Sequence, residues 1–240
     1  MKYAIDAVLQ VRMDSSRLPG KAALPILGKP LVAHIIERLT LSEYIRHIII
    51  ATTEESLSPL RSILADYDFV KYFAGSKDNV LDRFHKAAKK YDSDFVVRVT
   101  GDNPLTDPDF LDKAVEMHLD AEADLTHYLG IPLGTGVEVI SADSLAMAYR
   151  SASQIYDLEH VTPYLYKNRQ FFKVLEPVST GIYYEPNARV TVDTQQDYYH
   201  VNGLFEFFAP KPYISMEDIV HYCRMTRAVP AELGRQSLAV

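Results

Sequence analysis

The sequence predicts an α/β fold built around a mostly parallel sheet. Short apolar runs such as IRHIIIA and DFVVRV alternate with segments of helical period such as PLVAHIIERL. This alternation is typical of repeated βαβ units. Ser-, Gly- and Asp-containing loops follow several of the apolar runs. In sheets of this kind, ligands bind where such loops leave the carboxyl ends of the strands.

In the first half of the chain, the pattern predicts strands and helices in strict alternation. We expect strands at residues 3–9, 45–51, 71–73 and 94–99, and helices at residues 31–39, 58–67, 80–90 and 108–118. The second helix would begin at Ser58 as N-cap with Pro59 at its first position. Asp107 would cap the fourth helix in the same way, and Asp109 would favour its positive end.

After residue 130 the chain becomes richer in proline, glycine and tyrosine. We expect strands at residues 125–128, 136–140, 172–176, 182–184 and 190–192. We expect helices at residues 144–151, 196–207 and 216–225, with a partly helical stretch at 160–167 and a polar tail at the end. No repeat or long linker interrupts the chain, so residues 1–240 are predicted to form a single domain.

Composition excludes several classes of partner. The formal net charge is -7 and the isoelectric point is near 5.6, which argues against broad attraction to nucleic acid or anionic lipid. Cys223 is the single cysteine, so neither a disulfide framework nor a thiolate metal site is expected, and a cytoplasmic location is favoured. No run approaches the roughly 20 apolar residues that span a bilayer.

The loop after the first strand combines Arg12, Arg17 and Lys21 with serine, proline and glycine. Three long cations at the end of a strand can surround an anion with several oxygens, such as a triphosphate. The loop matches neither the P-loop nor the dinucleotide fingerprint. Spacing alone leaves open a surface turn whose cations are simply solvated.

The stretch RMDSSRLPGKAALPILGKPL at residues 12–31 resembles the signature of the CMP-sugar-acid cytidylyltransferases. The resemblance is strongest to the branch of the spore coat polysaccharide biosynthesis protein F, which is related to the 3-deoxy-manno-octulosonate and acylneuraminate cytidylyltransferases. It implies a three-layer, GT-A-like nucleotidyltransferase fold. It also implies that Arg12, Ser15, Arg17 and Lys21 wrap the phosphates of CTP, and that the backbone near Leu9 and Gln10 lies under the base.

One residue of this loop departs from the family pattern. Asp14 stands where a small residue, usually glycine, is expected. A carboxylate there would repel phosphate unless it turned outward or paired with Arg17.

Two further segments end apolar runs with a carboxylate. In RVTGDNPLTDPDF, Asp102 follows Gly101 at the end of a predicted strand, and in RVTVDTQQD, Asp193 does the same. Mg²⁺ takes one or two protein carboxylates beside phosphate oxygens, so Asp102 is the first candidate metal ligand and Asp193 the second. The resemblance supports both. An alternative for the second segment is that Asp193 or Thr194 only caps the following helix.

Other segments acquire a role only through the resemblance. FAGSKDNVLDRF implies contacts to cytosine and ribose from Ser76, Asn79 and Arg83. Glu138 and the pair Glu159 and His160 resemble positions that line the sugar-acid pocket or shape a dimer interface, although His160 could equally be structural. The family often has an arginine before the Glu-His pair, whereas this chain has Leu158.

Taken over nearly the whole chain, the resemblance implies a Mg²⁺-dependent transfer of CMP from CTP to a sugar acid or related acidic acceptor, for surface polysaccharide precursors. Arg12, Lys21 and Asp102 would act in catalysis, residues 130–190 would hold the acceptor and form the dimer contact, and the protein would be a homodimer. Two alternatives stay open: a sugar-nucleotide-dependent glycosyltransferase on the same fold, and an inactive nucleotide-binding homologue.

Overall fold

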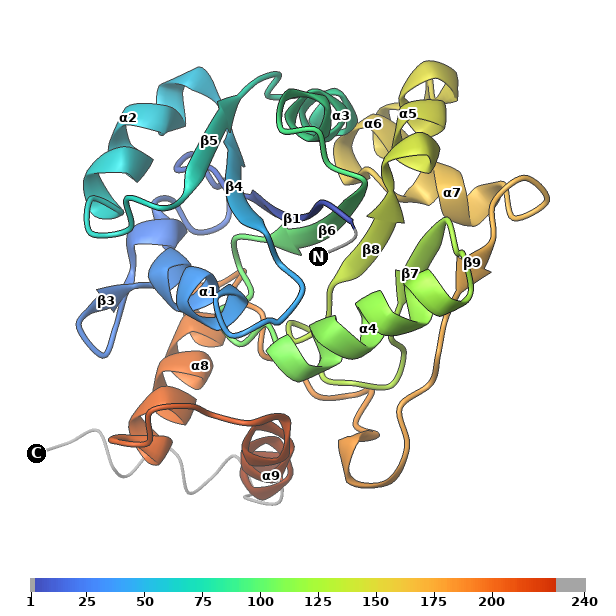
Figure 1. The fold of residues 1–240 in the computed structure, drawn as a ribbon. Helices are drawn as coiled ribbons and strands as arrows, with labels where there is room; N and C mark the ends of the chain where they lie inside the picture. Colours follow the sequence, from blue (N-terminus) through green and yellow to red (C-terminus); the bar gives the residue numbers. More distant parts are fainter. Residues whose placement is uncertain (1–2, 228–240) are drawn as a thin grey trace, which may run out of the picture.

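A computed structural model of the chain describes residues 3–227. Its centre is a seven-stranded sheet in the order β5-β4-β1-β6-β8-β7-β9 (Figure 1). These strands are β1 (Ile5–Gln10), β4 (His47–Thr52), β5 (Lys71–Ala74), β6 (Phe95–Thr100), β7 (Leu125–His127), β8 (Glu138–Ser141) and β9 (Val174–Leu175). Within this sheet, the two pairs that involve β8 are antiparallel and the others are parallel. The expected mostly parallel α/β sheet is therefore confirmed.

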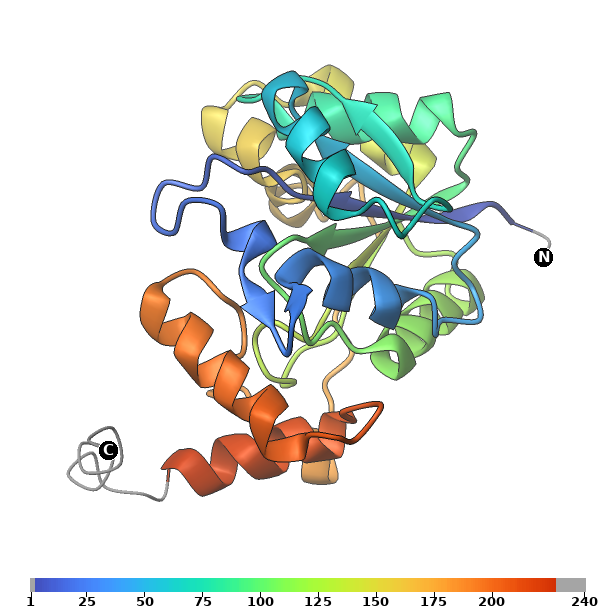
Figure 2. The same ribbon diagram turned by 90° about the vertical axis from the view of Figure 1, so that its left-hand side faces the viewer.

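Helices cover both faces of the sheet, which gives the three layers that the family resemblance implies (Figures 1 and 2). The helices are α1 (Leu31–Leu39), α2 (Glu54–Ile63), α3 (Val80–Lys90), α4 (Pro108–Asp120), α5 (Ala142–Ser151), α6 (Ile155–His160), α7 (Pro163–Lys167), α8 (Gln195–Phe208) and α9 (Met216–Arg227). Both views show α8 and α9 below α1, farther from the sheet than the other helices. The short strands β2 (Pro25–Ile26) and β3 (Lys29–Pro30) form a hairpin between the 3₁₀ turn η1 (Lys21–Ala23) and α1.

Alternation along the central strands produces two apolar cores. Leu9, Ile50 and Val99 belong to one buried cluster, which includes side chains of α1, α2, α4, α8 and α9, whereas Val8 and Ile49 belong to the other, with side chains of α3, α5 and α7. Each such side chain, buried completely, contributes about 1.5–3 kcal/mol to folding. Burial on both faces explains why the central strands are continuous apolar runs.

The start of α2 differs from the prediction. The helix begins at Glu54 and ends at Ile63, so Pro59 lies inside it and Ser58 is not its N-cap. Thr53 precedes the helix, and Glu54 and Glu55 occupy its first turn, where acidic side chains favour the positive end of the helix dipole. The predicted cap of α4 is correct, because Asp107 accepts a hydrogen bond from Phe110 N at 3.0 Å.

Three predictions for the second half are wrong in detail. The expected strand at 182–184 is replaced by a 3₁₀ turn, η2 (Gly181–Tyr183), and β9 is shorter than predicted. Residues 190–192 are extended, but this segment makes only an isolated bridge, between Arg189 and Leu133. Helix α6 was not predicted. A β-forming sequence becomes a strand only where a neighbouring strand is available to pair with it.

None of the helices between residues 3 and 227 combines the length and apolar character that crossing a bilayer requires.

Candidate active site

The candidate site lies at the carboxyl edge of the sheet, where β1 ends at Gln10 and β6 at Thr100. The loop that leaves β1 arches over this edge, between the layer of α6 and α7 and helix α8 (Figure 2). Below it are two adjoining cavities, of about 610 and 350 Å³, that share Gln10, Arg12 and Glu159. A third cavity, of about 490 Å³, adjoins the second at Arg98 and Thr100.

Asp102 reaches this cleft because the chain turns closely after β6. Gly101 N donates to Gln10 O at 2.8 Å, and a Cβ at Gly101 would lie 2.7 Å from the side chain of Val11. Only glycine therefore allows this close approach. Thr100 Oγ1 donates to Asp102 Oδ1 at 2.5 Å and so orients the carboxylate.

Asp193 arrives at the same place from a distant segment. Val190 N donates to Leu133 O, and Val192 N donates to Asp102 O, both at 2.8 Å. Gly134 permits this contact because its φ is +105°, and a Cβ there would lie 2.6 Å from Thr191 N. Backbone pairing thus delivers Asp193 next to Asp102.

Lys21 joins the two carboxylates. Its Nζ donates to Asp102 Oδ2 at 3.1 Å, to Asp193 Oδ1 at 3.2 Å and to Val192 O at 2.9 Å. The lysine and Asp193 side chains are each 14% exposed, so this contact is better shielded from solvent than an ordinary surface pair. The structure therefore brings together the loop cation and both strand-end carboxylates, as the sequence predicted.

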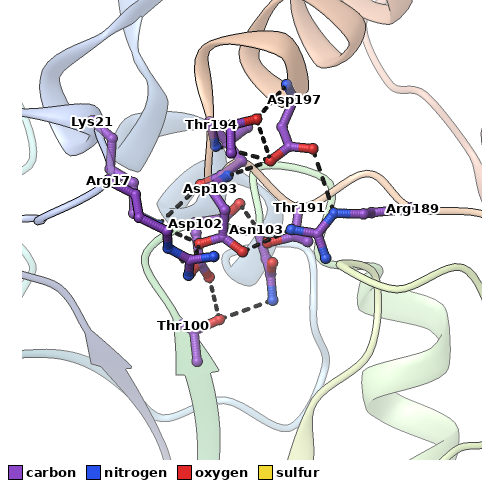
Figure 3. A network of polar contacts seen from close by, with 11 residues as sticks. Arg17, Lys21, Thr100, Asp102, Asn103, Arg189, Thr191, Asp193, Thr194 and Asp197 are labelled. Carbon is purple, nitrogen blue, oxygen red and sulfur yellow. Dashed lines mark hydrogen bonds and ion pairs between the residues drawn. The ribbon is translucent and has the colours of Figure 1, made fainter. Parts of the chain in front are cut away.

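Two arginines complete the network around Asp193 (Figure 3). Arg17 Nη2 donates to Asp193 Oδ1 at 2.9 Å and Arg189 Nη2 to Oδ2 at 2.7 Å. Burial alone would raise the pKa of Asp193, but the hydrogen bond from Arg189 and the charge of Lys21 lower it below the ordinary value. The sequence analysis did not predict a role for Arg189. Its position four residues before Asp193 could have indicated that the two side chains form an ion pair.

Helix capping, the alternative role of this segment, falls to the next residue. Thr194 Oγ1 accepts from Asp197 N at 3.2 Å, and the Asp197 carboxylate accepts from Thr194 N at 2.8 Å. These reciprocal bonds form a capping box at the start of α8. The side chain of Asp193 is thereby left to face Lys21.

Asp14 does not pair with Arg17. It lies 3.5 Å from Arg12 Nε and forms an ion pair with Lys77. The hydrogen bond from Lys77 holds the pKa of Asp14 below its usual value. Lys77 was not predicted to take part. Because two cations offset this carboxylate, its repulsion of a phosphate is reduced.

Ser76, Asn79 and Arg83 line the largest of these cavities together with Gln10. Asn79 caps α3 by accepting from Asp82 N at 2.8 Å, and Arg83 Nη1 donates to Ser76 O at 2.7 Å. Arg83 is 1% exposed, and burial lowers its pKa to about 10. The Leu9 side chain packs into the sheet core and Gln10 lines the cavity. That the backbone near these two residues lies under the base stays a prediction.

The remaining predicted residues are distributed over all three cavities. Ser15 and His160 line the second, and Glu159 lines the first and second. Glu138 lines the third, where it accepts from Arg98 Nη1 at 2.6 Å and Tyr166 OH at 3.0 Å. The roles of these residues stay predictions.

The donor set fits Mg²⁺. Between residues 3 and 227, no group of three or more His, Cys, Asp or Glu side chains is arranged to hold a metal ion. Mg²⁺ beside a nucleotide needs only one or two carboxylates, since phosphates and water supply the other ligands. Asp102 and Asp193 provide two converging carboxylates, held at present by Lys21.

A mostly parallel sheet whose carboxyl edge carries Arg17, Lys21 and Arg189 around Asp193 is typical of α/β proteins that bind an anionic ligand at this edge. The family model described as Cytidylyltransferase matches residues 7–232. The chain therefore belongs to the cytidylyltransferase family.

Relatives agree with this assignment. The chain is 30% identical over 218 residues to the spore coat polysaccharide biosynthesis protein SpsF of Bacillus subtilis, a match covering 89% of this chain and 91% of that one. A cytidylyltransferase structure from Leptospira borgpetersenii superposes with a TM-score of 0.87 at 28% identity, over 94% of this chain and 95% of that one. A CMP:2-keto-3-deoxy-manno-octonic acid synthetase complexed with CTP shares the fold, with a TM-score of 0.67 at 16% identity over 85% and 99% of the two chains.

Proposed function

We propose that this protein transfers CMP from CTP to a sugar acid or a related small acidic acceptor and releases pyrophosphate. The observation on which this mainly rests is the convergence of Asp102 and Asp193 on Lys21 beneath a loop that also holds Arg12 and Arg17. Family membership supports the use of CTP. The spore coat polysaccharide relative suggests a product that serves as a surface polysaccharide precursor.

In the proposed step, an acceptor oxygen attacks the α-phosphorus of CTP. A new bond forms between that oxygen and the phosphorus, the bond from the phosphorus to the bridging oxygen breaks, and pyrophosphate leaves with that electron pair. The proton of the acceptor hydroxyl passes to solvent. Arg12, Arg17 and Lys21 offset the charge on the phosphates, and the cleft holds the reactants in line. No covalent enzyme intermediate is needed.

Asp102 and Asp193 would hold Mg²⁺ in this reaction. The ion would supply positive charge to the triphosphate oxygens. Lys21 would then remain beside the same carboxylates as a second positive charge, and Thr100 would keep Asp102 oriented through its hydroxyl. We assign Ser76, Asn79, Arg83 and Gln10 to the cytidine, because they line the cavity next to the phosphate loop.

Residues 130–190 would bind the acceptor and contribute to a homodimer. Four large apolar side chains in or near α5, α6 and α7 are strongly exposed: Met147 (44%), Ile155 (80%), Tyr156 (58%) and Phe171 (70%). We infer that a second copy covers this face. Light scattering after size-exclusion chromatography should report a dimer, and Phe171→Glu should weaken it. Phe69 is also exposed but lies just before β5, so the control variant Phe69→Glu should leave the dimer intact. A monomeric wild-type protein would refute this arrangement.

The reaction is tested by incubating the protein with CTP, Mg²⁺ and a panel of sugar acids, and by measuring pyrophosphate. Release that depends on both acceptor and metal, with CTP preferred over UTP, supports the proposal. Because cells make CTP in the cytoplasm, we expect the reaction there. CTP binding in calorimetry without turnover of any acceptor would favour an inactive homologue, and preferential binding of a nucleoside diphosphate sugar would favour a glycosyltransferase.

A further inference from the structure

The cavity of about 490 Å³ beside the phosphate cleft contains an arginine whose donors are mostly unused. We propose that Arg98 binds the acid group of the acceptor, and that the acceptor turns an apolar face toward the opposite wall of this cavity. This inference rests on the proposed transfer of CMP and specifies how that reaction selects its acceptor.

Arg98 lies on β6 directly across from Glu138 on β8. Its Nη1 donates to Glu138 Oε2 at 2.6 Å, while its Nε is buried and has no partner. Nη2 donates to no side chain or backbone oxygen in the described part of the chain. A guanidinium offers five N–H donors, and its side chain here is only 17% exposed. A largely buried cation with most donors free indicates a missing anion, since unmet donors on a charged group are costly.

Arg98 lies where the acceptor cavity meets the cleft that is proposed to hold the phosphates of CTP. Arg98 and Thr100 belong to the walls of both the phosphate cleft and the third cavity. Asp102, which borders the phosphate cleft, lies two residues after Thr100, and its carboxylate accepts a hydrogen bond from Lys21 Nζ at 3.1 Å. An acid group held by Arg98 therefore lies next to the place where the α-phosphate is expected.

Glu138 serves to hold the arginine rather than the substrate. Besides Arg98, it accepts from Thr162 Oγ1 at 3.1 Å and from Tyr166 OH at 3.0 Å. These bonds occupy both carboxylate oxygens and tie β8 to α7. They hold Glu138 in place beside Arg98 Nη1, and Nη2 of Arg98 is the donor that we assign to the ligand.

The charge of the cavity wall sets the charge of the ligand. Among its lining residues, Arg98 and Glu138 supply one positive and one negative side chain, already paired. A single carboxylate can share Arg98 with Glu138, whereas a phosphate dianion would add more repulsion from Glu138 than one arginine offsets. A monoanionic acid is therefore favoured over a phosphorylated sugar.

Much of the remaining wall is apolar, although Asn103, His127 and Tyr128 also line it. It contains Leu129, Ile131, Pro132, Leu133 and Pro186, and Leu133 is 56% exposed. Such a surface suits a deoxy carbon or an acyl group better than a continuous row of hydroxyls, because burying unpaired hydroxyls costs free energy. We accordingly expect the acceptor to turn an apolar carbon or acyl substituent toward this wall.

The experiment compares Arg98→Gln with Arg46→Gln. Arg46 also pairs with a buried carboxylate, Asp6, at 2.6 Å, but at the opposite end of the sheet. With N-acetylneuraminate or 3-deoxy-manno-octulosonate, whichever the wild type uses better, Arg98→Gln should raise the acceptor KM about 10- to 100-fold and leave the KM for CTP within about twofold. Arg46→Gln should change neither constant, and Arg98→Lys should restore part of the acceptor affinity because it restores the charge.

The apolar wall is tested separately with Leu133→Ser, an exposed substitution that does not threaten folding. It should raise the KM of an N-acylated acid several-fold and that of its free-amine counterpart much less.

An unchanged acceptor KM in Arg98→Gln, in an enzyme that turns over, overturns the inference while leaving the proposed function intact. If the wild type turns over no acceptor, the same acids can be titrated calorimetrically into protein saturated with an α,β-methylene analogue of CTP. Equal acceptor affinity of the wild type and Arg98→Gln in this titration would refute the role of Arg98.

Discussion

At the scale of single residues, the site depends on Lys21, whose ammonium contacts Asp102, Asp193 and a backbone carbonyl at once. Lys21→Met removes this charge without changing the length of the side chain much. We expect kcat/KM for CTP to fall by at least about 10²-fold, the usual effect of losing one well-placed electrostatic contact to a transition state. Steady-state pyrophosphate release measures it.

Lys29→Met is the matched control for this change. Lys29 lies nearby in the sequence but pairs with Glu37 at 2.7 Å and is 53% exposed, so kcat/KM should stay close to the wild-type value. Thermal unfolding of both variants would separate misfolding from lost chemistry. A Lys21→Met enzyme with full activity would remove this lysine from the proposed mechanism.

At the scale of elements, the site depends on the extended segment that precedes α8. A Cβ at Gly134 would meet Thr191 N at 2.6 Å and Val190 C at 2.8 Å, and backbone atoms cannot move aside cheaply. Gly134→Ala should therefore displace residues 189–192 and draw Asp193 away from Lys21. We expect about 1–3 kcal/mol less stability and at least a tenfold lower activity, as measured by denaturant unfolding and by turnover.

Gly181→Ala isolates the effect of backbone conformation. Gly181 also has a positive φ, +63°, but a Cβ there meets nothing within 4 Å. This variant should lose only about 1 kcal/mol and keep its activity. Equal behaviour of the two variants would mean that the contact between Gly134 and Thr191 does not position Asp193.

At the scale of the whole molecule, a buried histidine should make stability depend on pH. His118, in α4, is fully buried; its Nδ1 lies 2.9 Å from Thr126 Oγ1, and its Nε2 has no partner. Burial lowers the pKa of His118 to about 4, whereas the unfolded chain titrates near about 6.5. The unfolded state thus binds the proton first as the pH falls.

Neutral, buried His118 therefore contributes fully to the free energy of unfolding above about pH 6.5. As the pH falls toward 4 this contribution is lost, and the free energy of unfolding decreases by up to about 3 kcal/mol. Glutamine cannot titrate, so the unfolding free energy of His118→Gln should fall less steeply as the pH is lowered through this interval. The difference in slope should correspond to the uptake of about one proton on unfolding. Urea unfolding at several pH values measures the slope for both proteins. Since burial also lowers the pKa of His34 and His200, the difference between the proteins is the informative quantity, and identical slopes would contradict the assignment.

Local sequence was enough to predict much of the architecture. Strands β1, β4 and β6 are buried on both faces, so their apolar runs identify them without knowledge of their neighbours. The cap at Asp107 depends only on residues within one helical turn. The long loop signature at residues 12–31 likewise indicated the family, because it is contiguous.

What sequence could not provide are contacts between segments far apart in the chain. The partner of Asp14 is Lys77 rather than Arg17, Arg189 joins Asp193, and Arg98 meets Glu138 across two antiparallel strands. Each depends on how separate loops pack, which no local pattern encodes. The sequence by itself thus determined the central strands β1, β4 and β6, helices α1, α3 and α4, and the cationic loop, because these follow from periodicity and short-range chemistry. Only the tertiary structure decided how Asp193 comes to lie beside Lys21 and Asp102, because that approach is set by the backbone hydrogen bond from Val192 N to Asp102 O.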